Sequence, residues 1–202
     1  MIHVATCTCN IAAKYPSNGL TYGYATAFFV GPTLLLTAAH IYDGADTEIV
    51  AQLPGRQTTH VDIKQLFLEK PPIQVFKCSA LLLNRPVAAD ILVLDCSSSG
   101  YRAHSWIDIS RNYLVDGVGI DLVGYPGPYS PQYVADTQNM PEVSATDIDD
   151  LRDLLPACQL TISYGTVMKE FRAPILRSYR VSTIGGMSGS PVVLGGKAVG
   201  IV

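Results

Sequence analysis

Residues 185–191 read Gly-Gly-Met-Ser-Gly-Ser-Pro, the most specific pattern in the chain. Ser188 stands at its centre, with glycine at the second and third positions before it and at the position after it. Glycine lets the backbone turn tightly enough for N–H groups to point to one place beside the serine. A serine hydroxyl is a poor nucleophile at neutral pH unless a base lies next to it. The pattern therefore raises the question of which residue could supply that base.

A histidine and an aspartate stand in suitable contexts earlier in the chain. Residues 36–40 read Leu-Thr-Ala-Ala-His, so that His40 follows an apolar segment and two small residues. Residues 89–94 read Ala-Asp-Ile-Leu-Val-Leu, so that Asp90 directly precedes another apolar segment. Histidine can act as the base because its unperturbed pKa is about 6.5, and a buried carboxylate would fix its tautomer and stabilise the imidazolium. We take His40, Asp90 and Ser188 as the candidate catalytic residues.

The backbone amides of Gly186 and Ser188 are the candidate donors to an oxyanion that develops during the reaction. Each motif alone also has a structural interpretation. His40 could be a buried structural histidine, Asp90 a turn former at a strand end, and Ser188 part of a tight turn. Their occurrence together favours the catalytic interpretation. This chemistry needs no cofactor, and no cysteine or histidine spacing matches a metal site.

Short apolar segments separated by Gly, Pro, Asn and Ser run through the chain. Such a pattern predicts an all-β sandwich or barrel, because no alternation of strands with long helices is present. The predicted strands are residues 24–30, 33–37, 48–53, 75–83, 91–95, 120–124, 160–168, 175–181, 191–194 and 197–202.

Composition excludes several classes of protein. The 202 residues are 48% hydrophobic and 15% charged, with a net charge of -3 and no long basic run. We therefore expect no nucleic-acid partner. The most apolar stretch, residues 27–39, is broken by Gly31-Pro32 and is shorter than the about 20 residues that a membrane span needs. We expect no membrane partner.

The five cysteines are odd in number and widely scattered, at positions 7, 9, 78, 96 and 158. A disulfide framework would leave one of them unpaired. Residues 1–15 have no basic residue before an apolar core and so do not resemble a secretory signal. We expect mostly buried thiols in a reducing compartment, with a cytoplasmic location favoured over secretion.

The chain divides into two predicted halves. A candidate linker, rich in Ser and Gly at its start, begins at Ser97-Ser98-Ser99-Gly100. We place the boundary between residues 1–115 and 116–202. Within the second half, residues 128–160 hold six acidic residues and one arginine. We expect this acidic insertion to be a surface loop with one short helix over residues 146–155. It could be a solvated loop, a lid or a partner surface.

The three motifs, in the order His40, Asp90, Ser188, resemble those of trypsin-like serine proteases of the chymotrypsin order. The resemblance is closer to the V8-like glutamyl endopeptidases. That branch carries the turn Gly-Tyr-Pro-Gly, here residues 124–127, and the run Ser-Thr-x-Gly-Gly-x-Ser-Gly-Ser-Pro-Val, here residues 182–192. The resemblance implies two antiparallel six-stranded β-barrels with the active site in the cleft between them. It implies that His40 and Asp90 come from the first barrel and Ser188 from the second.

The chain departs from this family at three places. Met187 stands where digestive-type relatives have the aspartate that pairs with a freed N-terminus. We therefore expect the loop that carries Ser188, residues 185–190 (the serine loop), to form without N-terminal processing. By resemblance, Ser182, Thr183 and Val202 line the pocket for the substrate side chain. Ser182 replaces the aspartate of trypsin-like pockets, and Val202 replaces the histidine of the glutamate-specific enzymes. We therefore expect a neutral pocket that takes a small, apolar or polar side chain.

The third departure lies after Val202, where the relatives continue with a pocket wall and a further strand. We expect the second barrel to be incomplete at this end and to offer an open edge to a partner chain. The sequence thus predicts a serine endopeptidase acting on protein or peptide substrates. Two alternatives stay open: a weak or inactive protease-fold binding module, and a self-processing domain of a longer polypeptide.

Overall fold

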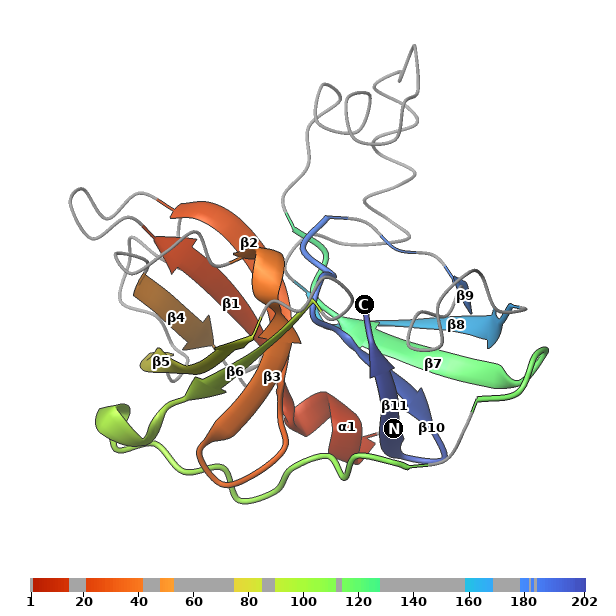
Figure 1. Cartoon of the computed structure of the whole chain (residues 1–202), viewed down its shortest axis with the longest axis horizontal. Coiled ribbons are helices and arrows are strands. Elements are labelled where there is room, and N and C mark those ends of the chain that lie inside the picture. The colour runs from red at the N-terminus through yellow and green to blue at the C-terminus, as the bar shows by residue number, and fades with distance from the viewer. Residues whose placement is uncertain are drawn as a thin grey trace, which may run out of the picture.

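The computed structural model describes residues 2–14, 21–41, 48–52, 75–84, 90–111, 114–127, 159–168, 179–181, 183 and 185–202. Over these residues the regular secondary structure is almost entirely β-strand, which confirms the all-β prediction (Figure 1). Its elements are α1 (Ile2–Thr6), β1 (Thr8–Lys14), β2 (Thr21–Phe29), β3 (Leu34–Ala38), β4 (Glu48–Gln52), β5 (Val75–Asn84), β6 (Ile91–Asp95), β7 (Gly119–Gly124), β8 (Thr161–Val167), β9 (Tyr179–Arg180), β10 (Pro191–Leu194) and β11 (Lys197–Ile201), with 3-10 helices at Ala39–Ile41 and Ser97–Ser99. Among the helices in these ranges, none has the length and apolarity to span a membrane.

The first sheet is a closed barrel with the strand order β1-β2-β3-β6-β5-β4. Successive side chains of a strand point to opposite faces, so residues two apart share a face. In β2, Ala25, Ala27 and Phe29 pack inside the barrel, while Phe28 on the other face packs outside it. Residues 25–29 are therefore buried on both faces, which explains why this strand reads as a continuous apolar run.

The second sheet has the order β11-β10-β7-β8-β9 in the part of the chain that the structure describes. Its core contains Leu122 of β7, Val192 of β10 and Val167 of β8, together with Met187 from the loop before β10. The closed barrel and this second sheet together confirm the predicted chymotrypsin-like architecture.

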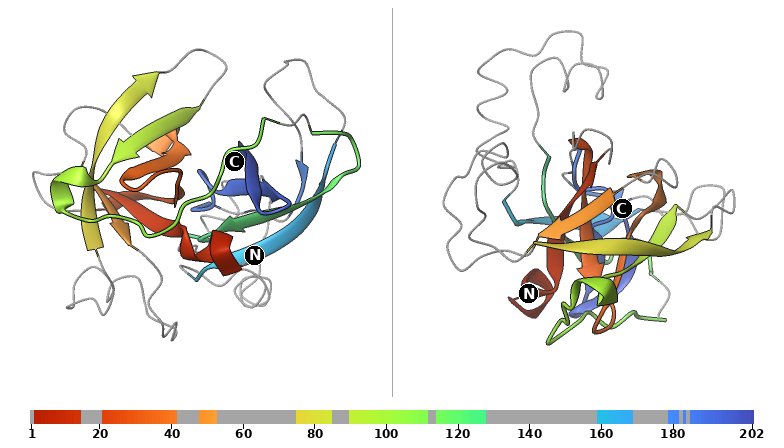
Figure 2. Two further views of the ribbon diagram at one scale, coloured as in Figure 1. Left: turned by 90° about the horizontal axis from the view of Figure 1, so that it is seen from below. Right: turned by 90° about the vertical axis from the view of Figure 1, so that its left-hand side faces the viewer.

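A third apolar cluster joins the two units. Phe28 of β2 meets Val123 of β7 and Val193 of β10 there, and Val4 of α1 is buried with them. Figure 2 shows α1 against the junction of the two sheets. The junction is a hydrophobic core in its own right, and it holds the loops at its rim in fixed relative positions.

The predicted strands differ from the observed ones mainly at the N-terminus. Strand β1 pairs with both β2 and β4 in the barrel, yet neither β1 nor α1 was predicted. Four of the seven residues in the segment 8–14 are Asn, Ala or Lys, which are depleted in strands, and its place between two strands makes it β-structure. The predicted strand 175–181 is described only from residue 179 and is a strand at Tyr179–Arg180.

The segment that connects the two sheets coincides with the candidate linker that begins at Ser97. It holds the 3-10 helix Ser97–Ser99 and otherwise extended chain, with an isolated bridge from Ile109 to Ala198 of β11. The boundary predicted at residue 115 falls in this segment and stays a prediction. The helix expected over 146–155, and almost all of the acidic insertion, lie outside the described residues.

Candidate active site

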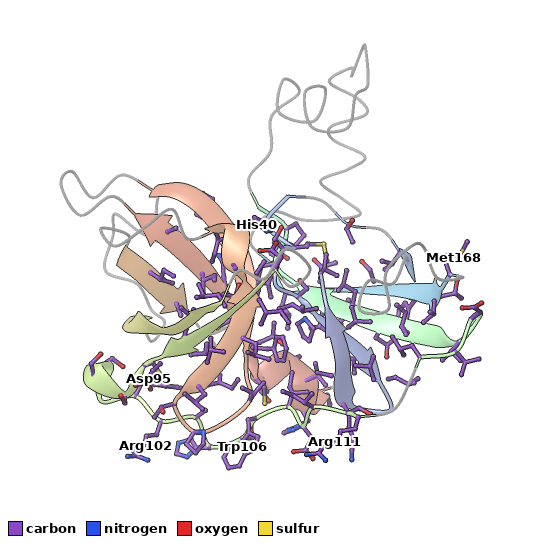
Figure 3. The ribbon with its side chains drawn as sticks, viewed as in Figure 1. His40, Asp95, Arg102, Trp106, Arg111 and Met168 are labelled. Carbon is purple, nitrogen blue, oxygen red and sulfur yellow. The ribbon has the colours of Figure 1, made fainter. Side chains whose placement is uncertain are left out.

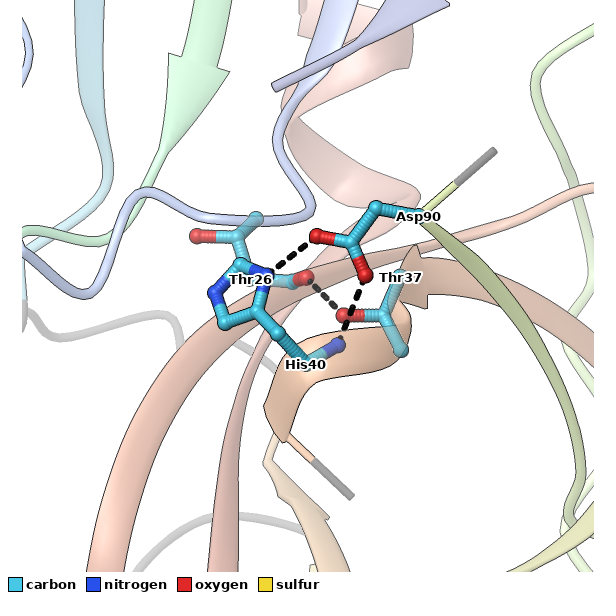
Figure 4. Close-up of polar contacts among 4 residues, drawn as sticks. All are labelled: Thr26, Thr37, His40 and Asp90. Atoms are coloured by element: carbon cyan, nitrogen blue, oxygen red, sulfur yellow. Dashed lines mark hydrogen bonds and ion pairs between the residues drawn. The ribbon is translucent and has the colours of Figure 1, made fainter. Parts of the chain in front are cut away.

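His40 and Asp90 are brought together by the pairing of two strands. Strand β3 ends at Ala38, which lies opposite Ile91, the first residue of β6. His40 follows in the 3-10 helix Ala39–Ile41, and Asp90 directly precedes β6. The Asp90 carboxylate pairs with Nδ1 of the His40 ring and also accepts the backbone N–H of His40 at 2.8 Å (Figure 4).

Asp90 thus contacts both the ring and the backbone of His40. Two bonds from one carboxylate fix the direction of the ring and leave Nε2 as the nitrogen not held by Asp90. The Ala39 N–H also donates to the Asp90 carbonyl at 3.2 Å. This arrangement is the one that orients a histidine base.

The expectation of a buried carboxylate was wrong. The Asp90 side chain is 55% exposed and that of His40 is 56% exposed. Asp90 lies at the rim of the barrel, before the first residue of β6, so half of its side chain remains in solvent. Desolvation raises the pKa of Asp90, but the bonds from the His40 ring and backbone and from Ala39 outweigh it and hold this pKa below its usual range.

Ser188 comes from the other half of the chain and is tied to the first barrel through its backbone. The N–H of Thr26, on the outer face of β2, donates to the Ser188 carbonyl at 2.8 Å. The next residue, Gly189, has a φ of 85°, and a Cβ there would overlap Thr26 O and the Thr37 hydroxyl. Thr37 of β3 lies three residues before His40, so the backbone beside Ser188 is adjacent to the strand that leads into the histidine.

Ser188 belongs to the loop on one side of the contact between Gly189 and Thr37, and His40 follows the strand on the other side. Across the described ranges, the Ser188 hydroxyl makes no hydrogen bond to the His40 ring. In a free enzyme such a bond is often long or badly aligned, and it tightens when substrate binds. Figure 3 places His40 at one end of the junction of the sheets and Trp106 of the connecting segment at the other.

The amides of Gly186 and Ser188 are directed by bonds to the carbonyls that precede them. The Gly127 N–H donates to Gly185 O at 2.6 Å, and the Ser190 N–H donates to Met187 O at 3.0 Å. In a trans peptide the C=O and N–H point in opposite directions. The N–H groups of Gly186 and Ser188 therefore point away from these bonds, and neither donates to another residue that the structure describes.

The predicted specificity residues are placed in part. Ser182 lies outside the described residues, and Thr183 is exposed. Val202 is half-buried, and its N–H donates to Ser190 O at 3.1 Å while its carbonyl accepts from Gly189 N–H at 2.5 Å. Val202 therefore borders the serine loop, and the roles of all three stay predictions.

Sequence reasoning missed Thr26, which is fully buried and bonded to the serine loop. A signal was present, because Thr26 is the one polar residue in the apolar run 25–30. A hydroxyl buried on a strand must find partners, and here they lie on the other sheet. Among the described residues, no group of three or more His, Cys, Asp or Glu is placed to hold a metal ion.

Comparisons with known proteins agree with this architecture. The fold is similar to the crystal structure of Deg5, with a TM-score of 0.63 and 14% identity, covering 99% of this chain and 80% of that one. It is also similar to the active form of the Rv3671c protease from M. tuberculosis, with a TM-score of 0.59 and 13% identity, covering 98% of this chain and 70% of that one.

At these identities the likeness establishes the fold alone. No curated protein matches the chain in sequence. The family described as trypsin-like peptidase domain matches residues 25–201. This match spans most of the chain, which therefore belongs to the trypsin-like peptidase domain family.

Proposed function

We propose that the protein is a serine endopeptidase in which Ser188 is the nucleophile, His40 the general base and Asp90 the residue that orients His40. The observation that carries the proposal is the double contact of Asp90 with the His40 ring and backbone. It occurs beside the strands to which the Ser188 backbone is bonded. Two chain segments separated by almost the whole protein thus supply one base and one nucleophile to the same junction.

The reaction would proceed in two halves. Ser188 Oγ attacks the scissile carbonyl carbon while His40 Nε2 takes the hydroxyl proton, and the carbonyl oxygen becomes an oxyanion. The N–H groups of Gly186 and Ser188 donate to this oxyanion, because they have no other partner among the described residues. The C–N bond breaks as His40 returns the proton to the leaving amine. Water then attacks the acyl carbon while His40 takes its proton. The ester C–O bond to Ser188 breaks, His40 returns the proton to Ser188 Oγ, and the carboxylic acid product leaves.

The substrate is a protein or peptide chain, and we propose a neutral pocket for the side chain before the scissile bond. The identity of Ser182 and Val202 supports this, because neither carries the charge found in the pockets of the Arg/Lys-specific or Glu-specific relatives. The contact of Val202 with the serine loop is consistent with a place in the pocket. A position in the V8-like branch is supported by the turn 124–127, which bonds to the serine loop through Gly127.

The test is covalent labelling by a fluorophosphonate serine probe at about pH 7.5, with adducts counted by intact mass. We expect one adduct in the wild type and none in Ser188→Ala. In His40→Ala we expect labelling slower by several orders of magnitude, because the triad acts as a unit. Ser190→Ala, two residues further on, is the matched control and should label like the wild type. An adduct that persists in Ser188→Ala would contradict the assignment.

A second candidate function is a protease-fold binding module. In such a module the Ser188 hydroxyl, which makes no hydrogen bond to the His40 ring in the described structure, would stay unbonded after a peptide binds. Failure of the wild type to label, together with a measurable Kd for peptides, would favour this candidate. Cleavage of a longer polypeptide at its own boundary would instead favour the self-processing domain.

We also propose that the protein works in a reducing compartment, as its thiols suggest. The thiols of Cys7, Cys9 and Cys96 are buried. Mass spectrometry of protein isolated under alkylating conditions would test this, because oxidised cysteines would argue against it.

A further inference from the structure

Thr26 uses every polar group it has, and its four bonds reach the serine loop, the turn 124–127 and strand β3. Its N–H donates to Ser188 O at 2.8 Å, and its hydroxyl donates to Gly186 O at 3.1 Å. The same hydroxyl accepts the Tyr125 N–H at 2.9 Å. Its carbonyl accepts the Thr37 hydroxyl at 2.7 Å (Figure 4). Thr26 itself is fully buried.

Two of these bonds hold the serine loop on both sides of Met187. The carbonyls of Gly186 and Ser188 flank that residue, and both accept from Thr26. These two carbonyls share their peptide planes with the N–H groups of Met187 and Gly189. The plane that carries the Ser188 N–H lies between these two planes, and the plane that carries the Gly186 N–H adjoins the first of them. The clamp therefore sets the course of the backbone that carries both candidate oxyanion donors.

The other two bonds connect this clamp to the rest of the site. Tyr125 belongs to the turn 124–127, whose Gly127 N–H holds Gly185 O. Thr37 lies at the end of β3, three residues before His40. Thr26 is thus bonded to three parts of the site: strand β3, which leads into His40, the turn 124–127 and the serine loop.

We infer that Thr26 is a positioning residue of the catalytic site: its hydroxyl, between Gly186 O and Tyr125 N–H, holds the oxyanion donors at the distance from His40 that the reaction needs. This inference rests on the proposed serine mechanism. Thr26 touches neither the substrate nor the reacting atoms, so it acts through the Gly186–Ser188 backbone. A displaced donor weakens transition-state binding more than substrate binding, and the loss should therefore appear in kcat.

The experiment compares Thr26→Val with Thr26→Ser. Valine keeps the shape but leaves Gly186 O and Tyr125 N–H without their buried partner, whereas serine restores both bonds. We expect kcat to fall about ten- to a hundredfold in Thr26→Val with KM changed less than about threefold. In Thr26→Ser we expect kcat within about threefold of the wild type. Should Thr26→Val fail to fold, Thr26→Ala removes the same hydroxyl with less crowding.

Thr8→Val is the matched structural control. Thr8 is also fully buried, and its hydroxyl also donates to a backbone carbonyl, that of Val4 at 2.8 Å. Its loss should lower Tm and leave kcat unchanged, because this bond lies at the α1 end of the junction. Equal kcat in Thr26→Val and Thr8→Val would overturn the inference, as would failure of Thr26→Ser to restore kcat. A wild type that neither labels nor cleaves peptides would overturn the proposed function and this inference with it.

Discussion

Gly186 lies so close to Gly127 that a β-carbon on Gly186 would overlap the Gly127 amide nitrogen. Gly186 also has a φ of 93°, in the region that side chains avoid. The two residues belong to the serine loop and to the turn 124–127, and the contact accompanies the bond from Gly127 N–H to Gly185 O. Glycine at position 186 is therefore required twice, once by conformation and once by space.

Gly186→Ala should remove most of the activity. The new methyl group would push the turn and the loop apart, break the bond to Gly185 O and turn the Gly186 N–H away from the oxyanion. We expect kcat/KM to fall by at least about 100-fold, the effect of losing one oxyanion donor. Peptide hydrolysis and the rate of fluorophosphonate labelling both measure it.

Gly196→Ala separates the two causes. Gly196 has a φ of 79°, but no atom lies within 4 Å of the place that a β-carbon would take, so it carries the conformational cost without the overlap. We expect a loss of stability of about 1 kcal/mol and full activity. Equal activity in Gly186→Ala and Gly196→Ala would show that the contact with Gly127 does not hold the donors.

The predictable part of the fold came from apolar runs bounded by turn residues. The strands Ile91–Asp95 and Pro191–Leu194 were predicted to the residue, because a local pattern and its turns define both. The strand Thr8–Lys14 was missed, since small residues form a strand there only through pairing on both sides. The pattern of residues within one segment does not indicate which distant strands that segment pairs with.

The candidate site divides in the same way. His40, Asp90 and Ser188 each stand in a local motif, so the sequence could name them. The exposure of Asp90 and the four bonds of Thr26 depend on which strands lie side by side, and no single segment encodes that. Ser182 and residues 128–158 of the acidic insertion lie outside the described residues, and the expectations for them stay predictions.

Asp90→Asn should lower kcat about 10⁴-fold while the protein remains folded. An amide in place of the carboxylate cannot stabilise the imidazolium. Its NH2 group would also face one of the two N–H groups from which the Asp90 carboxylate now accepts hydrogen bonds. Steady-state kinetics with a peptide substrate measures the loss. A decrease below about tenfold would mean that the exposed carboxylate does not take part.

The same carboxylate affects stability at acid pH. Because its pKa is lower in the folded protein, its contribution is complete above the unfolded value of about 3.9 and is lost as the pH falls through the folded value. We expect Asp90→Asn to be less stable than the wild type at pH 7, by less than about 1 kcal/mol because the pair is exposed. The difference should shrink at pH 3. Urea unfolding at both pH values tests this, and a difference that grows at pH 3 would contradict it.

Met187 anchors the serine loop through its side chain. It is fully buried among Leu122, Val167 and Val192 of the second core. Met187→Ala should cost about 2–5 kcal/mol, whereas Met187→Leu should cost less than about 1.5 kcal/mol. Urea unfolding measures both. The expectation that the loop forms without N-terminal processing would fail if trimming the N-terminus raised the labelling rate by orders of magnitude.

Cys96 should remain a thiol through the neutral range. Desolvation, with a smaller contribution from the charge of Asp95, raises its pKa from 9.0 to about 11. The thiolate is the reactive form, so native Cys96 should resist iodoacetamide at pH 8 and react once the protein is unfolded in urea. Peptide mass spectrometry identifies the modified cysteine, and rapid modification of native Cys96 at pH 8 would refute the prediction.

The raised pKa of Cys96 also predicts how stability changes at alkaline pH. The folded protein keeps the thiol proton between about pH 9 and pH 11, where the unfolded chain has lost it. The contribution of Cys96 is therefore complete below pH 9 and declines as the pH rises toward 11. Cys96→Ala removes this one titration, so the free energy of unfolding should fall less steeply over that interval than in the wild type. Parallel slopes for the two proteins would mean that Cys96 titrates alike in the folded and unfolded chains.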